Sequence, residues 1–360
     1  MTADNSPFDA EKFMRDLERS TAEHARVVAQ RPGGEQLSES LGNAAQLLYD
    51  WTELLRLKAC ETRGVSPRQT YAWLPLEGST AFDDREQIAP AVESFCESRE
   101  LSSTHWLETN PTRNPTDWAI EYLERCFHTV SDNLAGIAQL VDGSQRLRAP
   151  ITLARSVLEA AATGCFVVDP SVESRERRRR ALNLHMAQTK EASNERRGSE
   201  EQEECEAELA ELVDFAGFAG FDLNRYKSSD LLPPRIKPPD GRHDSASSII
   251  ESVLPGVGIT MWRSMSAVAH SRRSHLLIYG EYTLPHEMKP WQRVESVAYH
   301  TLPGILVVRE LGDRLQRYLG WNYQPWPDLW DAVATQWSVA AGMDDARIRR
   351  DLGLSPNPTT

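Results

Sequence analysis

The sequence is short of cysteine, of long apolar runs and of basic residues, and each shortage excludes a class of protein. Its five cysteines are widely spaced and form no CxxC pair, which predicts reduced, buried thiols in a cytoplasmic protein instead of a disulfide framework or zinc knuckle. No segment reaches the roughly 20 apolar residues that a membrane-spanning helix requires. The first residues are acidic and lack an apolar signal core, so we expect no secretion by that route.

The charge balance is acidic. The chain has 360 residues, with 53 Asp and Glu against 40 Lys and Arg, and a formal net charge of −13. A broad, sequence-independent nucleic-acid surface requires an excess of basic residues, so the composition argues against one and leaves room only for a local basic site. The length is sufficient for one large domain or two ordinary ones.

Strand-like alternation is almost absent, whereas apolar residues recur at helical spacing along most of the chain. The pattern predicts an all-α, multi-helix bundle with a long charged helical hairpin. We expect an N-terminal helical region over 1–115, a helical core over 116–341 and a C-terminal tail over 342–360. The predicted helices cover 8–30, 36–62, 117–141, 149–170, 257–273, 291–319 and 328–340, with short helices joined by loops over 63–117.

Three of these segments have a distinctive composition. Residues 149–170 are apolar nearly all round, which predicts the central helix of the bundle. Residues 172–214 are highly charged and predict a solvated helix or helix pair. Residues 215–247 are rich in Pro and Gly and predict a loop.

Two further stretches allow alternative interpretations. The run RERRRR at 175–180 could bind the phosphates of a nucleic acid, but ion pairing with Glu173, Glu176 and the acidic stretch 200–211 is favoured. The Trp-rich stretch 321–330 could form an exposed surface for a protein partner, but fastening the C-terminal segment onto the bundle is favoured.

The stretch WRSMSAVAHSRRSH at 262–275 carries the strongest candidate site. Arg263, Ser266 and His270 are three and four residues apart, so a helix would place all three on one face. Ala or Leu would pack at these positions more easily than Arg, Ser and His. Their presence therefore suggests a catalytic or binding role.

Two other predicted helices carry polar pairs spaced i,i+4. Arg155 and Glu159 lie within the apolar central helix, and His128 and Asp132 lie in the helix before it. Buried charges are costly unless they are paired, and polar groups that converge from several helices are typical of functional sites. We therefore expect a supporting cluster of His128, Arg155 and Glu159. The alternative is a structural network that fixes the helix register, with Glu159 paired to Arg155 or to Arg263.

Other chemistries lack their motifs. His270 and His275 are five residues apart and would diverge by roughly 140° on a helix, and no HExxH motif supports a metal site. Ser266 has no GxSxG context, and the glycines of 255–258 follow no strand and precede no GK[ST] ending. We expect neither a metal ion nor a cofactor.

The spacing of Arg263, Ser264 and His270 resembles the motif of HEPN domains, in which Arg, a polar residue and a later His share one helix. That polar residue is more often Asn, Asp or His. The resemblance covers about 117–320 and implies a helical, homodimeric, metal-independent ribonuclease of phage defence or of toxin–antitoxin systems. It implies that His270 transfers the proton of a ribose 2′-hydroxyl, that Arg263 stabilises phosphate charge, and that Ser264 or Ser266 orients one of them.

A closer resemblance concerns the helices 149–170 and 261–271. They are similar to those of uncharacterised all-helical proteins common in actinobacteria, which carry a comparable Arg-x3-Glu helix and Ser-x3-His helix. This resemblance implies no activity. Two hypotheses follow: a HEPN-like ribonuclease that acts on RNA, or a non-catalytic scaffold or regulator that binds a protein partner through the charged hairpin or the Trp-rich end.

Overall fold

The computed structural model describes residues 34–62, 75–100, 115–141, 148–224, 235–236, 244–270, 290–321 and 326–342, with a few single residues between them. Within these ranges it confirms the all-α prediction. The helices are α2 (Gly34–Thr62), α3 (Thr80–Ser98), α5 (Pro115–Val141), α6 (Arg148–Val167), α7 (Ser174–Glu195), α8 (Glu200–Phe218), α9 (Ala246–Val253), α10 (Gly258–Ala269), α12 (Pro290–Leu319) and α13 (Trp326–Ala340). The short strands β1 (Leu223–Asn224) and β2 (Arg235–Ile236) pair antiparallel.

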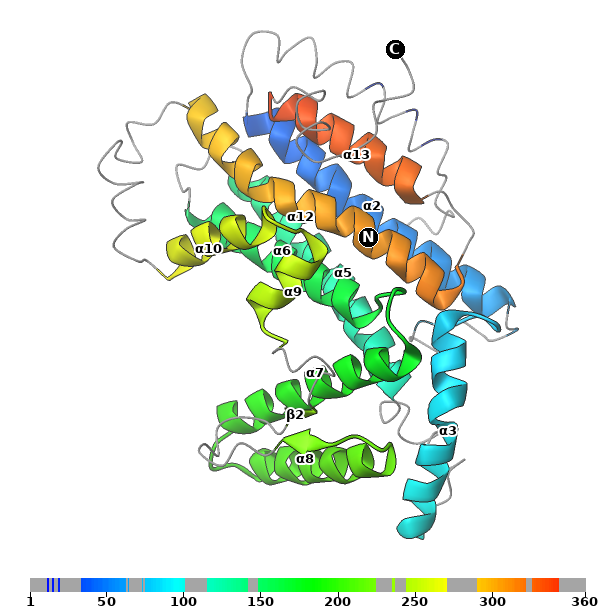
Figure 1. The fold of residues 1–360 in the computed structure, drawn as a ribbon. Helices are drawn as coiled ribbons and strands as arrows, with labels where there is room; N and C mark the ends of the chain where they lie inside the picture. Colours follow the sequence, from blue (N-terminus) through cyan, green and yellow to red (C-terminus); the bar gives the residue numbers. More distant parts are fainter. Residues whose placement is uncertain are drawn as a thin grey trace.

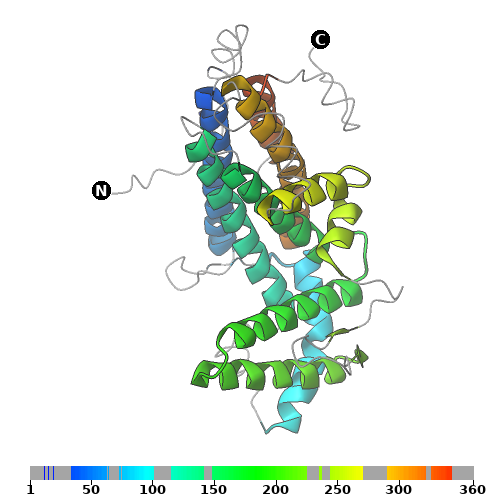
Figure 2. The same ribbon diagram turned by 90° about the vertical axis from the view of Figure 1, so that its left-hand side faces the viewer.

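Helix α6 lies at the centre of the main bundle, as its apolar sequence predicts (Figure 1). It packs against α5 and α12, and α9 and α10 lie across it. Glycines allow the close approach of α6 and α12, because a Cβ atom at Gly164 would lie 2.7 Å from Leu311 and one at Gly304 would lie 2.7 Å from Val157. Helices α2 and α13 complete the bundle on the other side (Figure 2).

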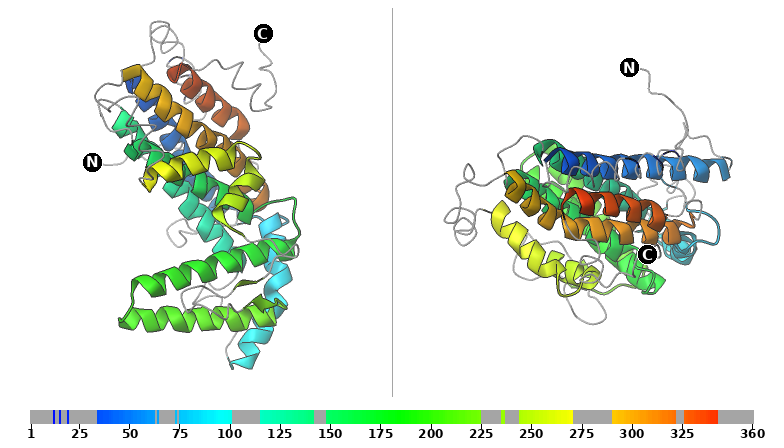
Figure 3. Two further views of the ribbon diagram at one scale, coloured as in Figure 1. Left: turned by 60° about the vertical axis from the view of Figure 1, so that its left-hand side comes forward. Right: turned by 90° about the horizontal axis from the view of Figure 1, so that it is seen from above.

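A second, smaller core lies at one end of the bundle, where α3 packs against the hairpin of α7 and α8 (Figure 3). The predicted charged segment is therefore a helix pair. It is only partly solvated, because one face of each helix contributes apolar side chains to this core. Its buried members include Val92, Phe95, Trp118, Leu182, Met186, Leu212 and Phe215.

The predicted boundary near residue 115 does not divide these cores. Helix α2 belongs to the main bundle with α5, whereas α3 belongs to the second core with α7 and α8. Both helices come from the region 1–115, which is therefore not a separate unit. The predicted helix over 8–30 and the tail over 342–360 lie almost wholly outside the described residues.

Three local predictions need correction. In the described part of the stretch 63–117, α3 runs unbroken for 19 residues with Pro90 inside it. The lost backbone hydrogen bond is offset by the apolar stripe that α3 buries in the second core. Helix α9 begins at Ala246, near the end of the predicted loop 215–247, and runs beyond it. It starts with a capping box in which Ser245 and Ser248 bond reciprocally. Helix α10 ends at Ala269, short of the predicted 273.

The C-terminal tryptophans fasten α13 to the bundle. Trp326 and Trp330 are fully buried, and their indole N–H groups donate to the carbonyls of Arg309 at 2.8 Å and Ile305 at 2.7 Å. The ring of Trp326 lies 4.2 Å from that of Trp51 on α2. Buried rings cannot form the exposed partner surface that was the alternative. No described helix is long and apolar enough to cross a membrane.

Candidate functional site

Glu159 ties α6 to α10 at the candidate site. Its Oε1 atom accepts hydrogen bonds from Arg155, at 3.0 Å from Nε and 2.8 Å from Nη2, and from the indole N–H of Trp262 at 2.5 Å. The guanidinium of Arg155 also lies over the Trp262 ring, 5.5 Å from its centre. Of the two partners predicted for Glu159, the structure therefore shows Arg155.

His270 joins this cluster from the end of α10. It is the C-cap residue, and its backbone N–H donates to the carbonyl of Ser266 at 2.9 Å. Its Nε2 atom lies 3.2 Å from Nη1 of Arg155. A guanidinium can only donate, so Nε2 accepts and the proton of a neutral imidazole resides on Nδ1. The arrangement presents the ring as a proton acceptor beside a cation.

Arg263 and His270 both have exposed side chains. Solvent can therefore reach the two residues that the sequence marks for chemistry, whereas Arg155 and Glu159 are half-buried. The expected burial of the polar cluster is thus only partial. The cluster therefore resembles a surface site, in which half-buried residues hold an exposed histidine, more than a polar network buried in the core.

Ser266 does not join the accessible residues. Its side chain is 7% exposed, and among the described residues its Oγ has no hydrogen-bond partner. It lies on the face of α10 that also buries Met261 and Met265. The predicted stripe divides because Arg263 and His270 are exposed, whereas Ser266 between them is buried. A catalytic role for Ser266 would require a substrate to reach a buried hydroxyl, and the half-buried Ser264 is the more accessible serine.

His128 and Asp132 also lie away from the cluster. Both side chains are exposed, and the His128 ring packs 6.5 Å from the ring of Tyr49 on α2. The α5 residue that interacts with α6 beside the cluster is Tyr122, which hydrogen-bonds to Thr163. Tyr122 precedes His128 by six residues, so the two point roughly 120° apart. The expectation that His128 supports the site is therefore incorrect.

Sequence reasoning missed Tyr122 and Trp262. Both read as apolar residues of amphipathic helices, and neither carries a charge that would distinguish it from the core. The available signal was the row of Arg155, Glu159 and Thr163 on α6, each four residues from the next. A polar row through an apolar helix needs partners on the neighbouring helices. Burial raises the pKa of Tyr122 above its usual range, so its hydroxyl stays protonated.

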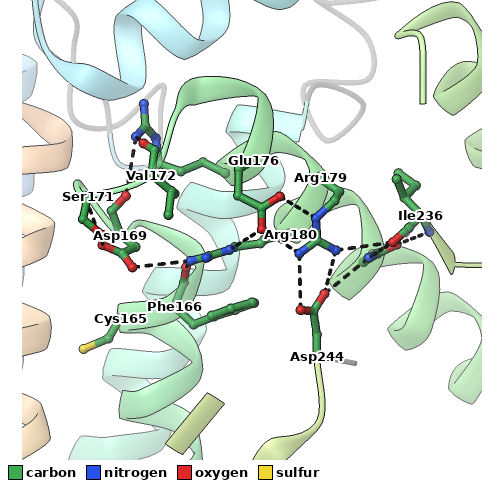
Figure 4. Close-up of polar contacts among 12 residues, drawn as sticks. Cys165, Phe166, Asp169, Ser171, Val172, Glu176, Arg179, Arg180, Ile236 and Asp244 are labelled. Atoms are coloured by element: carbon green, nitrogen blue, oxygen red, sulfur yellow. Dashed lines mark hydrogen bonds and ion pairs between the residues drawn. The ribbon is translucent and has the colours of Figure 1, made fainter. Parts of the chain in front are cut away.

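The arginine run of α7 forms the other polar network, and its ion pairs are intramolecular (Figure 4). Arg179 bonds to Glu176 and to Asp244, each at 2.7 Å, and Arg180 bonds to Glu176 at 2.9 Å. Arg180 also lies 3.9 Å from the centre of the Phe166 ring. The guanidinium groups of Arg177, Arg179 and Arg180 are therefore already paired with carboxylates of this chain. These contacts favour ion pairing over phosphate binding for the run.

The predicted partners of this run are right in part. Glu176 pairs as expected, but the other carboxylates are Asp84, Asp169 and Asp244 instead of the acidic stretch 200–211. The reason is the antiparallel hairpin. The arginines occupy the start of α7, opposite the end of α8, where Arg175 bonds to the Gly220 carbonyl. The acidic stretch begins at the start of α8, next to the end of α7.

Comparisons with protein-family models, with curated proteins and with solved protein structures find no match for this chain. The geometry of the cluster at the junction of α6 and α10 therefore carries the functional argument. No group of three or more metal-binding side chains occurs in the part of the chain that the structure describes.

Proposed function

We propose that the chain cleaves RNA without a metal ion, at the surface formed by Arg155, Arg263 and His270. The observation that carries the proposal is the 3.2 Å contact between His270 Nε2 and Arg155 Nη1 at an accessible helix junction. The contact supports the proposal because it sets an imidazole beside a guanidinium that also bonds to Glu159. A base and a phosphate-binding cation in contact are the minimal requirement for metal-independent phosphodiester cleavage.

The proposed reaction uses the 2′-hydroxyl of the RNA as nucleophile. In the free protein the Nε2 lone pair of His270 accepts from Arg155, so the substrate must first displace Nη1 of Arg155 from this nitrogen. Nε2 of His270 then accepts the proton of the 2′-hydroxyl as the hydroxyl oxygen bonds to the adjacent phosphorus. The bond from phosphorus to the 5′-oxygen then breaks, and that oxygen takes up a proton, which leaves a 2′,3′-cyclic phosphate and a 5′-hydroxyl. Arg263 and Arg155 stabilise the negative charge that builds up on the phosphate oxygens. Ser264 is the serine positioned to contact the phosphate.

A homodimer and a role in phage defence or in a toxin–antitoxin system remain part of this proposal. They rest on the motif resemblance. The exposed position of the cluster is compatible with a second copy covering it, since Arg263 and His270 lie on an open surface. Light scattering of the purified chain at micromolar concentration would measure the dimer directly.

The second candidate is a non-catalytic scaffold or regulatory protein in which the cluster has a structural role. The observation in its favour is that one oxygen of Glu159 accepts three hydrogen bonds from two helices. Such a hub can fix the packing of α10 on α6. In this case the exposed His270 is incidental, and its replacement changes neither stability nor activity.

The test compares an RNA oligonucleotide with its 2′-O-methyl counterpart, in the presence of EDTA. The proposal predicts cleavage of the first and none of the second, with cyclic phosphate ends. We expect His270→Ala to slow cleavage at least about 100-fold and Arg263→Ala at least about 10-fold. Cleavage of both oligonucleotides, or none of either, would exclude the mechanism.

A further inference from the structure

Helix α8 concentrates negative charge. Eight of its 19 residues are Glu or Asp and none is basic, in a chain whose net charge is −13. The arginine run of α7 pairs with carboxylates outside α8. Most of these acidic side chains are exposed along the outer side of the hairpin: Glu200, Glu201, Glu203, Glu204, Glu206, Glu208 and Asp214.

A small aromatic pocket opens beside this acidic face, between α8 and its neighbours α3, α5 and α7. The space at this pocket, with the open solvent at its mouth included, is about 270 Å³. The indole of Trp118 stacks on the His185 ring at 4.6 Å, and Phe215 stands at right angles to both Trp118 and Phe95. The lining residues are Phe95, Trp118, His185, Glu208, Glu211, Leu212 and Phe215.

This combination of groups favours a cation. Aromatic rings attract cations through their negative faces, and carboxylates at the rim add a direct charge. The same cluster already holds one cation of the chain, because the guanidinium of Arg99 lies 4.6 Å from the centre of the Phe95 ring and pairs with Asp214 at 2.8 Å. Glu208 also lies 3.2 Å from His185 at the rim of this cluster.

We propose that this pocket receives the ammonium group of a lysine from a basic protein partner, and that the acidic face of α8 binds the neighbouring cationic residues. The rings of Phe95, Trp118 and Phe215 are 0 to 4% exposed, so the opening is narrow. A primary ammonium is about the size of a water molecule and fits without displacing the rings, whereas a trimethylated one would have to push them apart. The inference is independent of RNA cleavage, since it concerns the other core.

Fluorescence anisotropy of a labelled nonalysine peptide titrated with the full chain tests the proposal. The double variant Glu208→Gln/Glu211→Gln removes two charges at the pocket. The control Glu200→Gln/Glu203→Gln removes two charges from the same helix but away from it. We expect the first to weaken binding at least about tenfold and the second at most about threefold, because only the first removes carboxylates that face the rings.

If the two double variants weakened peptide binding equally, α8 would attract cations without a pocket, and the proposal would be overturned. The absence of peptide binding by the wild-type chain would also overturn it. A nonapeptide of trimethyllysine, which carries the same charge, should bind more weakly than nonalysine. Butylammonium chloride has the head group of a lysine side chain and should compete better than sodium chloride at equal ionic strength, but only at millimolar concentration. No advantage over sodium chloride would overturn the pocket, and competition at micromolar concentration would instead identify a site for free small amines.

Discussion

Arg177 and Asp84 form a buried, two-pronged ion pair that joins α7 to α3. The Nε and Nη2 atoms of Arg177 each lie 2.8 Å from a different oxygen of Asp84, and the two side chains are 9% and 1% exposed. Asp84 lies in the first turns of α3 and Arg177 in the first turns of α7. The pair therefore fixes how the hairpin of the second core is joined to the rest of the chain.

Removing one partner of this pair should be costly. Asp84→Asn leaves a buried guanidinium without its counter-charge, and we expect a loss of about 3–5 kcal/mol in the free energy of unfolding, measured in urea. Asp84→Leu combined with Arg177→Met should recover most of it. The control is Asp313→Asn, which removes an exposed partner of Arg317 and should cost under about 1 kcal/mol. Similar losses for the two Asp→Asn variants would show that the pair is not buried in solution.

Glu159 and His270 should differ in their effect on stability. Glu159→Ala removes three hydrogen bonds and leaves the donors of Arg155 and Trp262 half-buried, so we expect a loss of about 1–3 kcal/mol. His270→Ala removes one contact of an exposed ring and should cost under about 0.5 kcal/mol. Urea unfolding of both variants measures the difference. If His270→Ala were as destabilising as Glu159→Ala, His270 would have a structural role.

Asp117 should make the stability depend on pH. Burial raises the pKa of this carboxyl to about 6, and the guanidinium of Arg85, 3.8 Å away, lowers it only in part. An unfolded Asp has a pKa of about 3.9, so between these values the folded protein binds more protons. The free energy of unfolding contributed by Asp117 therefore falls as the pH rises from about 4 to 6.

Asp117→Asn should remove this part of the pH dependence and stabilise the protein at pH 7.5 by about 1–3 kcal/mol. The matched control is Asp328→Asn, at an exposed Asp that is also in the first turn of its helix. Thermal melts at pH 4.5 and 7.5 give the comparison. An unchanged pH profile for Asp117→Asn would contradict the burial of this carboxyl.

The five cysteines should react only after unfolding. All five are buried as free thiols, and burial raises the pKa of Cys126 to about 12. Thiolates are the reactive form, so a buried, protonated thiol is inert. A chromogenic disulfide reagent releases one coloured thiolate for each cysteine that reacts. At pH 8 we expect almost no coloured thiolate with the native protein, and five equivalents per chain in guanidinium chloride. Rapid reaction of one native thiol would show that its helix opens readily.

Helix positions could be predicted because apolar residues recur with the helical period, and α5, α6, α12 and α13 lie within a few residues of their predicted ranges. Composition misled where Pro and Gly were frequent. Pro90 lies inside α3, and α9 begins within a stretch read as loop. For α9, the signal was the serine pair Ser245 and Ser248, which is spaced as a capping box requires.

The candidate site was predicted less completely, because spacing places residues on one face without saying which way that face points. His128 follows the buried Phe127 by one residue, and this offset of about 100° directs it to solvent. Ion pairs between residues close in sequence could be predicted, as for Arg155 with Glu159 and Arg180 with Glu176. The contact of Arg155 with His270 spans 115 residues, and local spacing contains no information on it.

The most direct measurement is cleavage of total cellular RNA by the wild-type chain, His270→Ala and His128→Ala, in EDTA and at equal folded fraction. His128 is the matched control, since it is another exposed histidine but lies away from Arg155. The account predicts cleavage by the wild type and by His128→Ala, and its loss in His270→Ala. No cleavage by any of the three, or full cleavage by His270→Ala, would contradict a catalytic site at this junction.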